Sequence, residues 1–159
     1  MCADDQFLFS TRLSFSGDAS FKNWLLYQLK NGYRDIYMIY SRSNKLLGYV
    51  HSYGFSQKDG TAHVTVYMRE GCRGIAGGFA GLWYADHLFS SCHVRRIYAD
   101  VYDYNLTSHR NCRSAGFKEE GVLKDYRYFD GTFHDLHCLV MTMESFYKRY
   151  GKITEKWRE

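Results

Sequence analysis

Hydrophobic and polar residues follow two different periods along this chain of 159 residues. Apolar and polar side chains alternate over residues 62–68 and 96–102, and a period of two predicts β-strands. Between these segments, apolar residues recur at helical spacing up to about Phe89 and predict one buried helix face. A strand, a helix and a second strand in this order can form a βαβ unit whose two strands are parallel.

Further elements are predicted on both sides of this unit. They are a helix at 21–30, strands at 35–41 and 45–55, a short helix at 107–115, strands at 122–129 and 134–143, and a frayed or short helical tail from residue 147. The strand at 45–55 forms a hairpin with the strand at 61–68. This order predicts a single α/β domain over residues 1–159, in which a mixed, twisted central sheet carries helices on both faces.

A glycine-rich run, Arg-Gly-Ile-Ala-Gly-Gly at residues 73–78, opens the central helix. The first N–H groups of a helix have no partner inside the helix, and glycine lets a phosphate approach them closely. The run therefore predicts a site for a phosphorylated ligand. The structural alternative is close packing of the helix on the sheet, for which Gly77 and Gly81 would provide clearance.

Composition and charge limit the partners, metal sites and cellular location that we expect. The net charge of +4 is modest, and no Lys/Arg tract of the nucleic-acid-binding kind is present in the sequence. The five cysteines form no CxxC pair, which favours reduced thiols over a zinc or redox motif. Residues 1–5 are acidic where a secretion signal would be basic, and no apolar run approaches the roughly 18 residues of a membrane span. We therefore expect a cytoplasmic protein that binds no nucleic acid, membrane or metal.

Three segments in a fixed order carry a resemblance to a known family. The first is the glycine-rich run at 73–78. The second is Val-Tyr-Asp-Tyr-Asn-Leu-Thr-Ser at 101–108, followed by Ala-Gly-Phe at 115–117, and the third combines 119–125 with Gly-Thr-Phe-His-Asp at 131–135. Together they resemble the GNAT superfamily of acetyltransferases, most closely the branch with ribosomal-protein N-terminal and spermidine acetyltransferases.

The sequence departs from the family pattern in two places. Ala76 replaces the central glycine of the phosphate motif and narrows the backbone nest slightly. The family's leading strand either lies at residues 7–15, is missing, or is supplied by something else.

The resemblance implies acetyl-CoA as co-substrate. Its pyrophosphate would lie at the helix N terminus, and its pantetheine arm would enter a gap between the strands at 61–68 and 96–102. The residues implied as cofactor contacts are Val66, Met68, Arg73, Gly74, Ile75, Ala76, Gly77, Gly78, Asn105 and Ser108. For Asn105 and Ser108, turn formation and helix capping are the structural alternatives.

Two residues are candidates for proton transfer. Cys112 stands where many relatives carry a tyrosine that protonates the departing thiolate, although a small cysteine is also a common core residue. His63 stands where relatives often carry a glutamate base, and its ordinary pKa suits that role, directly or through a water. The structural alternative is a histidine on the surface or on a face of the sheet. The fold can also be active without either, since holding amine and thioester together supplies much of the rate.

Three functions fit these features to different degrees. Transfer of an acetyl group to a primary amine leads, with a small molecule or a peptide as acceptor: a protein N terminus, a polyamine, an aminosugar or an antibiotic amine. A non-catalytic acyl-CoA-binding module is the alternative. RNA binding by the aromatic strand at 47–55 fits poorly, because the element order and the charge pattern are wrong for it. Aromatic-rich edges are compatible with a homodimer.

Overall fold

The computed structural model describes residues 33–157 except Arg73, together with Asn23, Leu26, Tyr27 and Lys30. Backbone contacts divide the chain into two units, Met1–Gly32 and Tyr33–Glu159. In the first unit the four described residues are helical, within the helix predicted at 21–30. The rest of that helix and the predicted strand at 7–15 lie outside the described residues. The second unit contains every element discussed below.

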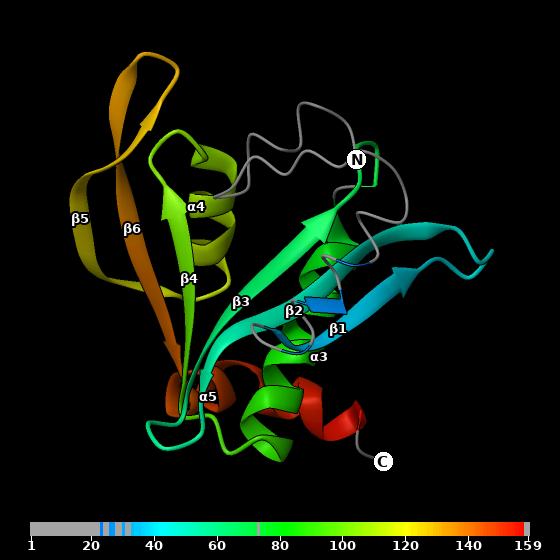
Figure 1. Cartoon of the computed structure of the whole chain (residues 1–159). Helices are drawn as coiled ribbons and strands as arrows, with labels where there is room; N and C mark the ends of the chain where they lie inside the picture. Colours follow the sequence, from blue (N-terminus) through cyan, green and yellow to red (C-terminus); the bar gives the residue numbers. More distant parts are fainter. Residues whose placement is uncertain (1–22, 24–25, 28–29, 31–32, 73, 158–159) are drawn as a thin grey trace. The chain divides into compact units, whose positions relative to one another are not determined.

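A six-stranded mixed sheet forms the centre of this unit, with strand order β1-β2-β3-β4-β6-β5 (Figure 1). Only the β3–β4 pair is parallel, as the predicted βαβ unit requires, and the other four pairs are antiparallel. The strands are β1 (Tyr33–Tyr40), β2 (Leu46–Ser56), β3 (Thr61–Met68), β4 (Arg96–Tyr102), β5 (Lys118–Phe129) and β6 (Thr132–Thr142). The predicted α/β fold class is confirmed.

Three helices and a short 3-10 turn accompany the sheet: α3 (Ile75–Ser91), α4 (Leu106–Ser114), α5 (Met143–Thr154) and η1 (Glu155–Trp157). Of the two alternatives predicted for the tail from residue 147, a frayed end or a short helix, the structure shows a helix, which begins earlier than predicted, at Met143. A complete helix of 12 residues begins directly after β6, because Thr142 and Ser145 cap its N terminus and Phe146 is fully buried. The hydrophobic contact of Phe146 was not visible as a repeating pattern in so short a segment.

The core lies on the face of the sheet that the three helices cover. Ile97, Ala99 and Val101 alternate along β4 and are buried on this face. Ile97 packs in one cluster with Leu88 of α3 and Phe146 of α5, while Ala99 and Val101 pack in a second cluster with Cys112 of α4. The prediction of helices on both faces depends on the 21–30 segment, whose placement relative to this unit is not determined.

The other face of β4 is polar and aromatic. Arg96, Tyr98 and Asp100 are half-buried there, and the ring of Tyr98 stacks on His63 of β3 at 5.3 Å. β4 therefore packs apolar side chains into the core on one face and presents titratable groups on the other. None of the helices that the structure describes is long and apolar enough to cross a membrane, and the cytoplasmic location stays a prediction.

Candidate functional site

The glycine-rich turn joins β3 to α3 through backbone conformations that side chains disfavour. β3 ends at Met68, and α3 begins at Ile75 with Gly74 as its N-cap residue. Gly71 has φ 71°, and Gly74 has φ 152° with ψ −147°, regions that residues with a Cβ rarely occupy. Arg73, the charged residue predicted beside the phosphates, lies outside the described residues. The bend therefore depends on glycine at two positions.

The remaining glycines of α3 separate into two kinds. A Cβ on Gly77 would stand 2.8 Å from Cγ of Met68, and one on Gly81 would stand 3.2 Å from Cγ2 of Val66. Close packing on β3, the structural alternative, therefore accounts for these two. A Cβ on the exposed Gly78 would meet no described atom within 4 Å, although glycine inside a helix costs about 0.5–1 kcal/mol relative to alanine. Packing gives no reason for glycine at position 78.

The N terminus of α3 has no side-chain cap within the part of the chain that the structure describes. The first turn of this helix contains no acidic residue. The Ile75 side chain is 79% exposed, so the surroundings are open to solvent. Unpaired N–H groups and the positive end of the helix dipole together favour an anion. This arrangement suits a phosphate group.

β3 and β4 pair only at their beginnings. Their parallel pairing runs from Thr61 with Arg96 to His63 with Tyr98 and extends no further over the described residues. Beyond that point the two strands diverge (Figure 1). The predicted separation of these strands is therefore present in the structure.

Beyond this point the backbone groups of β3 that face β4 have no strand partner among the described residues. The N–H of Arg69 donates to the Leu47 carbonyl, 2.8 Å away, and so faces β2. Backbone groups alternate in direction along a strand, so the N–H and C=O of Tyr67 also face β2. The N–H and C=O of Val66 and Met68 therefore face the opposite edge, toward β4. An extended ligand can hydrogen-bond along such an edge as an added strand. Both predicted contact residues lie on it.

Asn105 begins α4 as its N-cap residue. Its Oδ1 accepts a hydrogen bond from the Ser108 N–H at 3.2 Å, so the capping alternative is realised for both residues. The Asn105 side-chain NH2 has no partner among the described residues and remains a donor for a ligand carbonyl. Capping fixes the orientation of the amide and does not use its donor.

His63 occupies the last paired position before β3 and β4 separate. Its Nδ1 lies 2.9 Å from Oδ2 of Asp100 on β4, within ion-pair distance. The imidazole is stacked between Tyr53 at 5.1 Å and Tyr98 at 5.3 Å, which fixes the plane of the ring. The carboxylate partner gives His63 an orienting group that the sequence did not reveal, because Asp100 is 37 positions away.

Cys112 faces the core from α4. It packs against the cluster of Ala99, Val101 and Leu139, and burial raises the pKa of its thiol to about 11. A thiol with this pKa holds its proton at neutral pH and releases it reluctantly. Its surroundings are those of a small apolar residue, as the structural alternative requires.

Asp135 of the β5–β6 hairpin and Asp103, which follows β4, are held in internal contacts. Asp135 Oδ2 lies 2.6 Å from the Lys124 ammonium, and its Oδ1 accepts from the Asp125 N–H at 3.0 Å. His134 Nδ1 lies 2.7 Å from Asp103 Oδ1. Burial raises the pKa of Asp103, but hydrogen bonds from the Asp135 N–H and from His134 outweigh it and lower that pKa. These carboxylates are engaged within the protein.

A second group of titratable residues, His109, Glu119 and His137, was not predicted from the sequence. Glu119 Oε2 lies 2.8 Å from Nδ1 of His137 and 3.4 Å from Nε2 of His109. Hydrogen bonds from His137 and His109 lower the pKa of Glu119. No spacing in the sequence indicates this cluster, because its members come from α4, β5 and β6 and meet only after folding.

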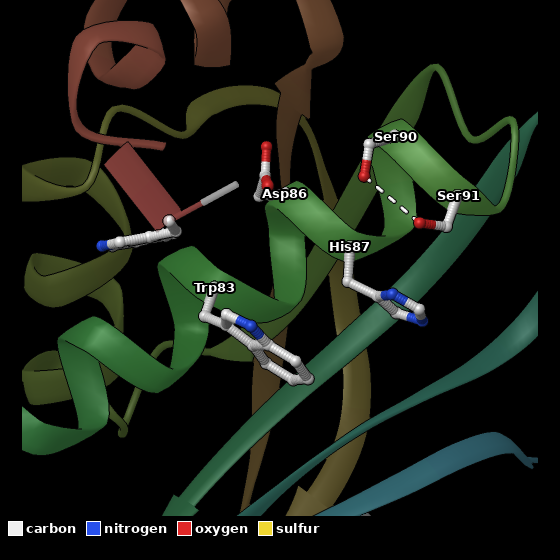
Figure 2. A pocket seen from close by; sticks show the side chains of 6 residues that line it. Trp83, Asp86, His87, Ser90 and Ser91 are labelled. Atoms are coloured by element: carbon white, nitrogen blue, oxygen red, sulfur yellow. Dashed lines mark hydrogen bonds between the residues drawn. The ribbon is translucent and has the colours of Figure 1, made fainter. Parts of the chain in front are cut away.

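A shallow cavity of about 360 Å³ lies at the other end of α3 (Figure 2). Trp83 and His87 stack in parallel along its wall, with ring centroids 5.8 Å apart. Its lining also includes Asp86, Ser90, Ser91 and Trp157. The nearest lining residue of α3, Trp83, lies eight positions beyond Ile75, about 12 Å along the helix from the glycine-rich turn. None of the predicted site residues lines the cavity.

The structure is an α/β domain in which β3 and β4 separate and the N terminus of α3 is uncapped. These two features suit an extended, phosphorylated ligand. The family model for acetyltransferase (GNAT) domains matches residues 12–138, and the chain belongs to this family. The resemblance drawn from the three sequence segments is thereby confirmed. Among curated proteins no sequence matches this one.

Solved structures show the same fold at low sequence identity. A probable GNAT-family acetyltransferase from Chromobacterium violaceum has a TM-score of 0.75 and 19% identity, over 89% of this chain and 75% of its own. Spermidine N-acetyltransferase from Vibrio cholerae, in complex with CoA and spermine, has a TM-score of 0.76 and 14% identity, over 85% of this chain and 80% of its own. A mutant form of the Vibrio cholerae enzyme reaches a TM-score of 0.78 at 16% identity, over 92% of this chain and 88% of its own.

Proposed function

We propose that this chain is an acetyl-CoA-dependent N-acetyltransferase that moves an acetyl group to a primary amine by direct attack on the thioester. The observation that carries the proposal is the succession of two open features along one segment. The unpaired edge at Val66 and Met68 leads directly into the turn before the bare N terminus of α3. An extended ligand with amides at one end and a pyrophosphate at the other matches this succession.

The same geometry supports the predicted cofactor contacts. Backbone N–H groups at the start of α3 would hold the pyrophosphate, with Arg73 adding charge beside it. Val66 and Met68 would pair with the pantetheine amides on one side, and the Asn105 NH2 would reach a carbonyl from the other. Ser108, in the first turn of α4, would add a further contact to the cofactor on the same side as Asn105. The pyrophosphate nest comprises Gly74, Ile75, Ala76, Gly77 and Gly78.

His63 is proposed as the base. An ammonium must lose a proton before its nitrogen can attack a carbonyl carbon. The Asp100 carboxylate, 2.9 Å from Nδ1 of His63, would favour a proton on that nitrogen and leave the lone pair of Nε2 to take the proton from the ammonium. The side chains are 32% and 24% exposed, so solvent can carry the proton away afterwards.

The acyl transfer itself needs positioning more than acid–base chemistry. Bound acetyl-CoA supplies an acyl group already activated as a thioester. The amine nitrogen forms a bond to the carbonyl carbon, the carbon–sulfur bond breaks, and the sulfur leaves as a thiolate. An N–H on the open edge of β3 would stabilise the negative charge that develops on the carbonyl oxygen. Alignment of the two reactants on a rigid sheet supplies much of the rate.

We assign Cys112 to packing and not to proton donation. Protonating a thiolate from a thiol whose pKa is about 11 is uphill by about 3 kcal/mol, because ordinary thiols have pKa values near 8.5. Water is then the proton source for the leaving thiolate. Replacement of Cys112 by serine should therefore leave the pH dependence of kcat unchanged, and a new dependence above pH 8 would contradict this assignment.

The acceptor is an amine whose further class stays open among protein N termini, polyamines, aminosugars and antibiotic amines. Three aspartates of the β5–β6 hairpin, Asp125, Asp130 and Asp135, would be needed to make an acidic pocket for a cationic acceptor, but each occupies a position with a structural role. Asp135 is paired with Lys124, and Asp125 and Asp130 have φ of 50° and 48° at positions where the hairpin bends. The hairpin therefore gives little reason to prefer a strongly cationic polyamine.

Thermal unfolding with and without acetyl-CoA tests the cofactor. At a hundredfold excess over Kd, binding adds about 2.7 kcal/mol, which for this size raises Tm by about 5–10 °C. The amine panel is then assayed by release of the CoA thiol. A Tm shift with turnover supports the proposal, and a Tm shift without turnover on any amine supports the acyl-CoA-binding module. No Tm shift at millimolar acetyl-CoA contradicts both.

The variant His63→Gln separates chemistry from binding. Loss of a general base should lower kcat by about 10²–10⁴-fold while the acetyl-CoA-induced Tm shift stays unchanged. The control is His93→Asn, an exposed histidine in a left-handed turn conformation that asparagine tolerates. A wild-type kcat in His63→Gln would contradict the assignment of His63 as the base. The proposed cofactor contacts would not be contradicted by that result.

A further inference from the structure

The cluster of His109, Glu119 and His137 joins three elements on one face of the sheet. His137 and Leu139 alternate with outward positions along β6, and Glu119 of β5 is the registered partner of Leu139. Leu139 packs in the core cluster that Cys112 of α4 also contacts. The face that carries Glu119 and His137 is therefore the one under α4, and His109 approaches it from that helix.

The three side chains direct their ligand-type atoms at one point. Nδ1 of His137 and Nε2 of His109 lie 2.8 and 3.4 Å from the same carboxylate oxygen, Oε2 of Glu119. All three atoms lie within 4.8 Å of one another. In a tetrahedral site with metal–ligand distances of about 2.0–2.1 Å, neighbouring ligand atoms are about 3.3 Å apart. Small rotations of the side chains would bring the three atoms to that spacing.

The chemistry of the set favours a borderline transition metal over a hard cation. Two imidazoles and one carboxylate are ligands that Zn²⁺ takes readily, whereas Mg²⁺ and Ca²⁺ prefer oxygen throughout. Three protein ligands leave a coordination position for water, unlike closed structural zinc sites. The side chains are 22–34% exposed, so an ion can enter from solvent.

We propose that His109, Glu119 and His137 form a binding site for one divalent transition-metal ion, with Zn²⁺ the best fit. The site fastens α4 to the β5–β6 pair. His109 lies one turn beyond Asn105, so a bound ion restrains the helix that begins at the proposed cofactor contacts. The proposal does not depend on acetyl transfer and is tested without it.

Cobalt provides the direct measurement. The full chain is stripped with a chelator and titrated with Co²⁺, whose visible d–d absorption reports the coordination of the ion. We expect one equivalent to saturate a tetrahedral or five-coordinate spectrum, with no thiolate-to-metal charge-transfer band, and Zn²⁺ to displace it. Tm should rise with Zn²⁺. Absence of a d–d band, or a band with thiolate character, would overturn the assignment.

Matched variants locate the ion. His137→Gln and Glu119→Gln should each weaken Co²⁺ binding by at least about tenfold, the lower end of what loss of a supporting partner alone causes. His93→Asn removes an imidazole elsewhere and should leave binding unchanged. Glu119→Gln keeps the shape of the side chain and removes its charge. It therefore tests the metal site even if a histidine variant fails to fold. Equal affinity in all variants, or several weakly bound ions, would also refute the site.

Discussion

The N termini of α3 and α5 show opposite solutions to the same physical problem. Every helix leaves its first N–H groups without partners inside the helix. At α5, the Thr142 side chain accepts from the Ser145 N–H and the Ser145 hydroxyl accepts from the Thr142 N–H, while Glu144 complements the dipole. At α3, the N-cap is Gly74, and no side chain in the described part of the chain takes such a role.

This difference separates a terminus built for stability from one kept open for a ligand. The capping of α5 satisfies donors internally and closes the end to other anions. The glycines of α3 remove side chains from the same positions at a cost in helix propensity. An uncapped, exposed end beside an unpaired strand edge is the feature that supports cofactor binding. Four substitutions test whether the two ends differ as described.

The largest expected effect is at Gly77, where packing and ligand binding would both be lost. Gly77→Val places a branched side chain against Met68 and should reduce the free energy of unfolding by about 1–3 kcal/mol, measured by urea denaturation. Gly78→Val, one position further and open, should change that free energy by no more than about 0.5 kcal/mol. Equal destabilisation of the two variants would remove the distinction between packing and open glycines.

Gly78→Val should instead weaken acetyl-CoA binding. The new side chain stands where a phosphate approaches the backbone, so Kd should rise by about tenfold or more, equivalent to about 1.4 kcal/mol, measured by isothermal titration calorimetry. Gly121→Val is the matched control, because Gly121 of β5 is also exposed with no described atom near its added Cβ. A Gly78→Val protein with wild-type affinity would place the pyrophosphate elsewhere.

Thr142→Ala should affect only the closed terminus. Loss of the cap lowers stability by about 1 kcal/mol, and the calorimetric Kd for acetyl-CoA should stay the same. Thr107→Ala, an exposed threonine within α4, controls for the loss of a threonine in a helix and should not destabilise. A changed Kd in Thr142→Ala would mean that the two helix ends are not independent.

The smallest effect, and the most specific, comes from a charge at the open terminus. Ile75→Glu should stabilise α3 by about 0.3–1 kcal/mol through its dipole, yet weaken acetyl-CoA binding relative to Ile75→Gln by repulsion of the phosphates. Both properties are measured at low and high salt, since screening should reduce both differences. If glutamate and glutamine variants bind acetyl-CoA equally, the terminus does not hold an anion.

Much of the fold was predictable because strand and helix periods are local properties. β3 and β4 fall at the predicted residues, and α3 runs two residues beyond its predicted end at Phe89. The first turn of α5 was not predicted, because a capping box and one buried aromatic leave little periodic signal. The glycine-rich turn was visible in the sequence because a helix N terminus and its preceding strand are adjacent along the chain.

The sequence alone could not separate the two kinds of glycine in α3. Gly77 and Gly78 are neighbours with the same residue type, and only the approach of Met68 distinguishes them. Cys112 presented the same difficulty, since its raised pKa depends on the apolar cluster around it. In each case the deciding contact comes from a different element.

The sequence by itself determined the order of β1 to β6, α3 and α4, the family, and the position of the glycine-rich turn before α3. The tertiary structure decided which residues meet. β6 inserts between β4 and β5, and this order brings His137 to Glu119 and places both beneath α4. The pairing of β3 with β4 places Asp100 beside His63. Strand order and register are set by burial of whole sheet faces, and that is a property of the folded chain which no local pattern contains.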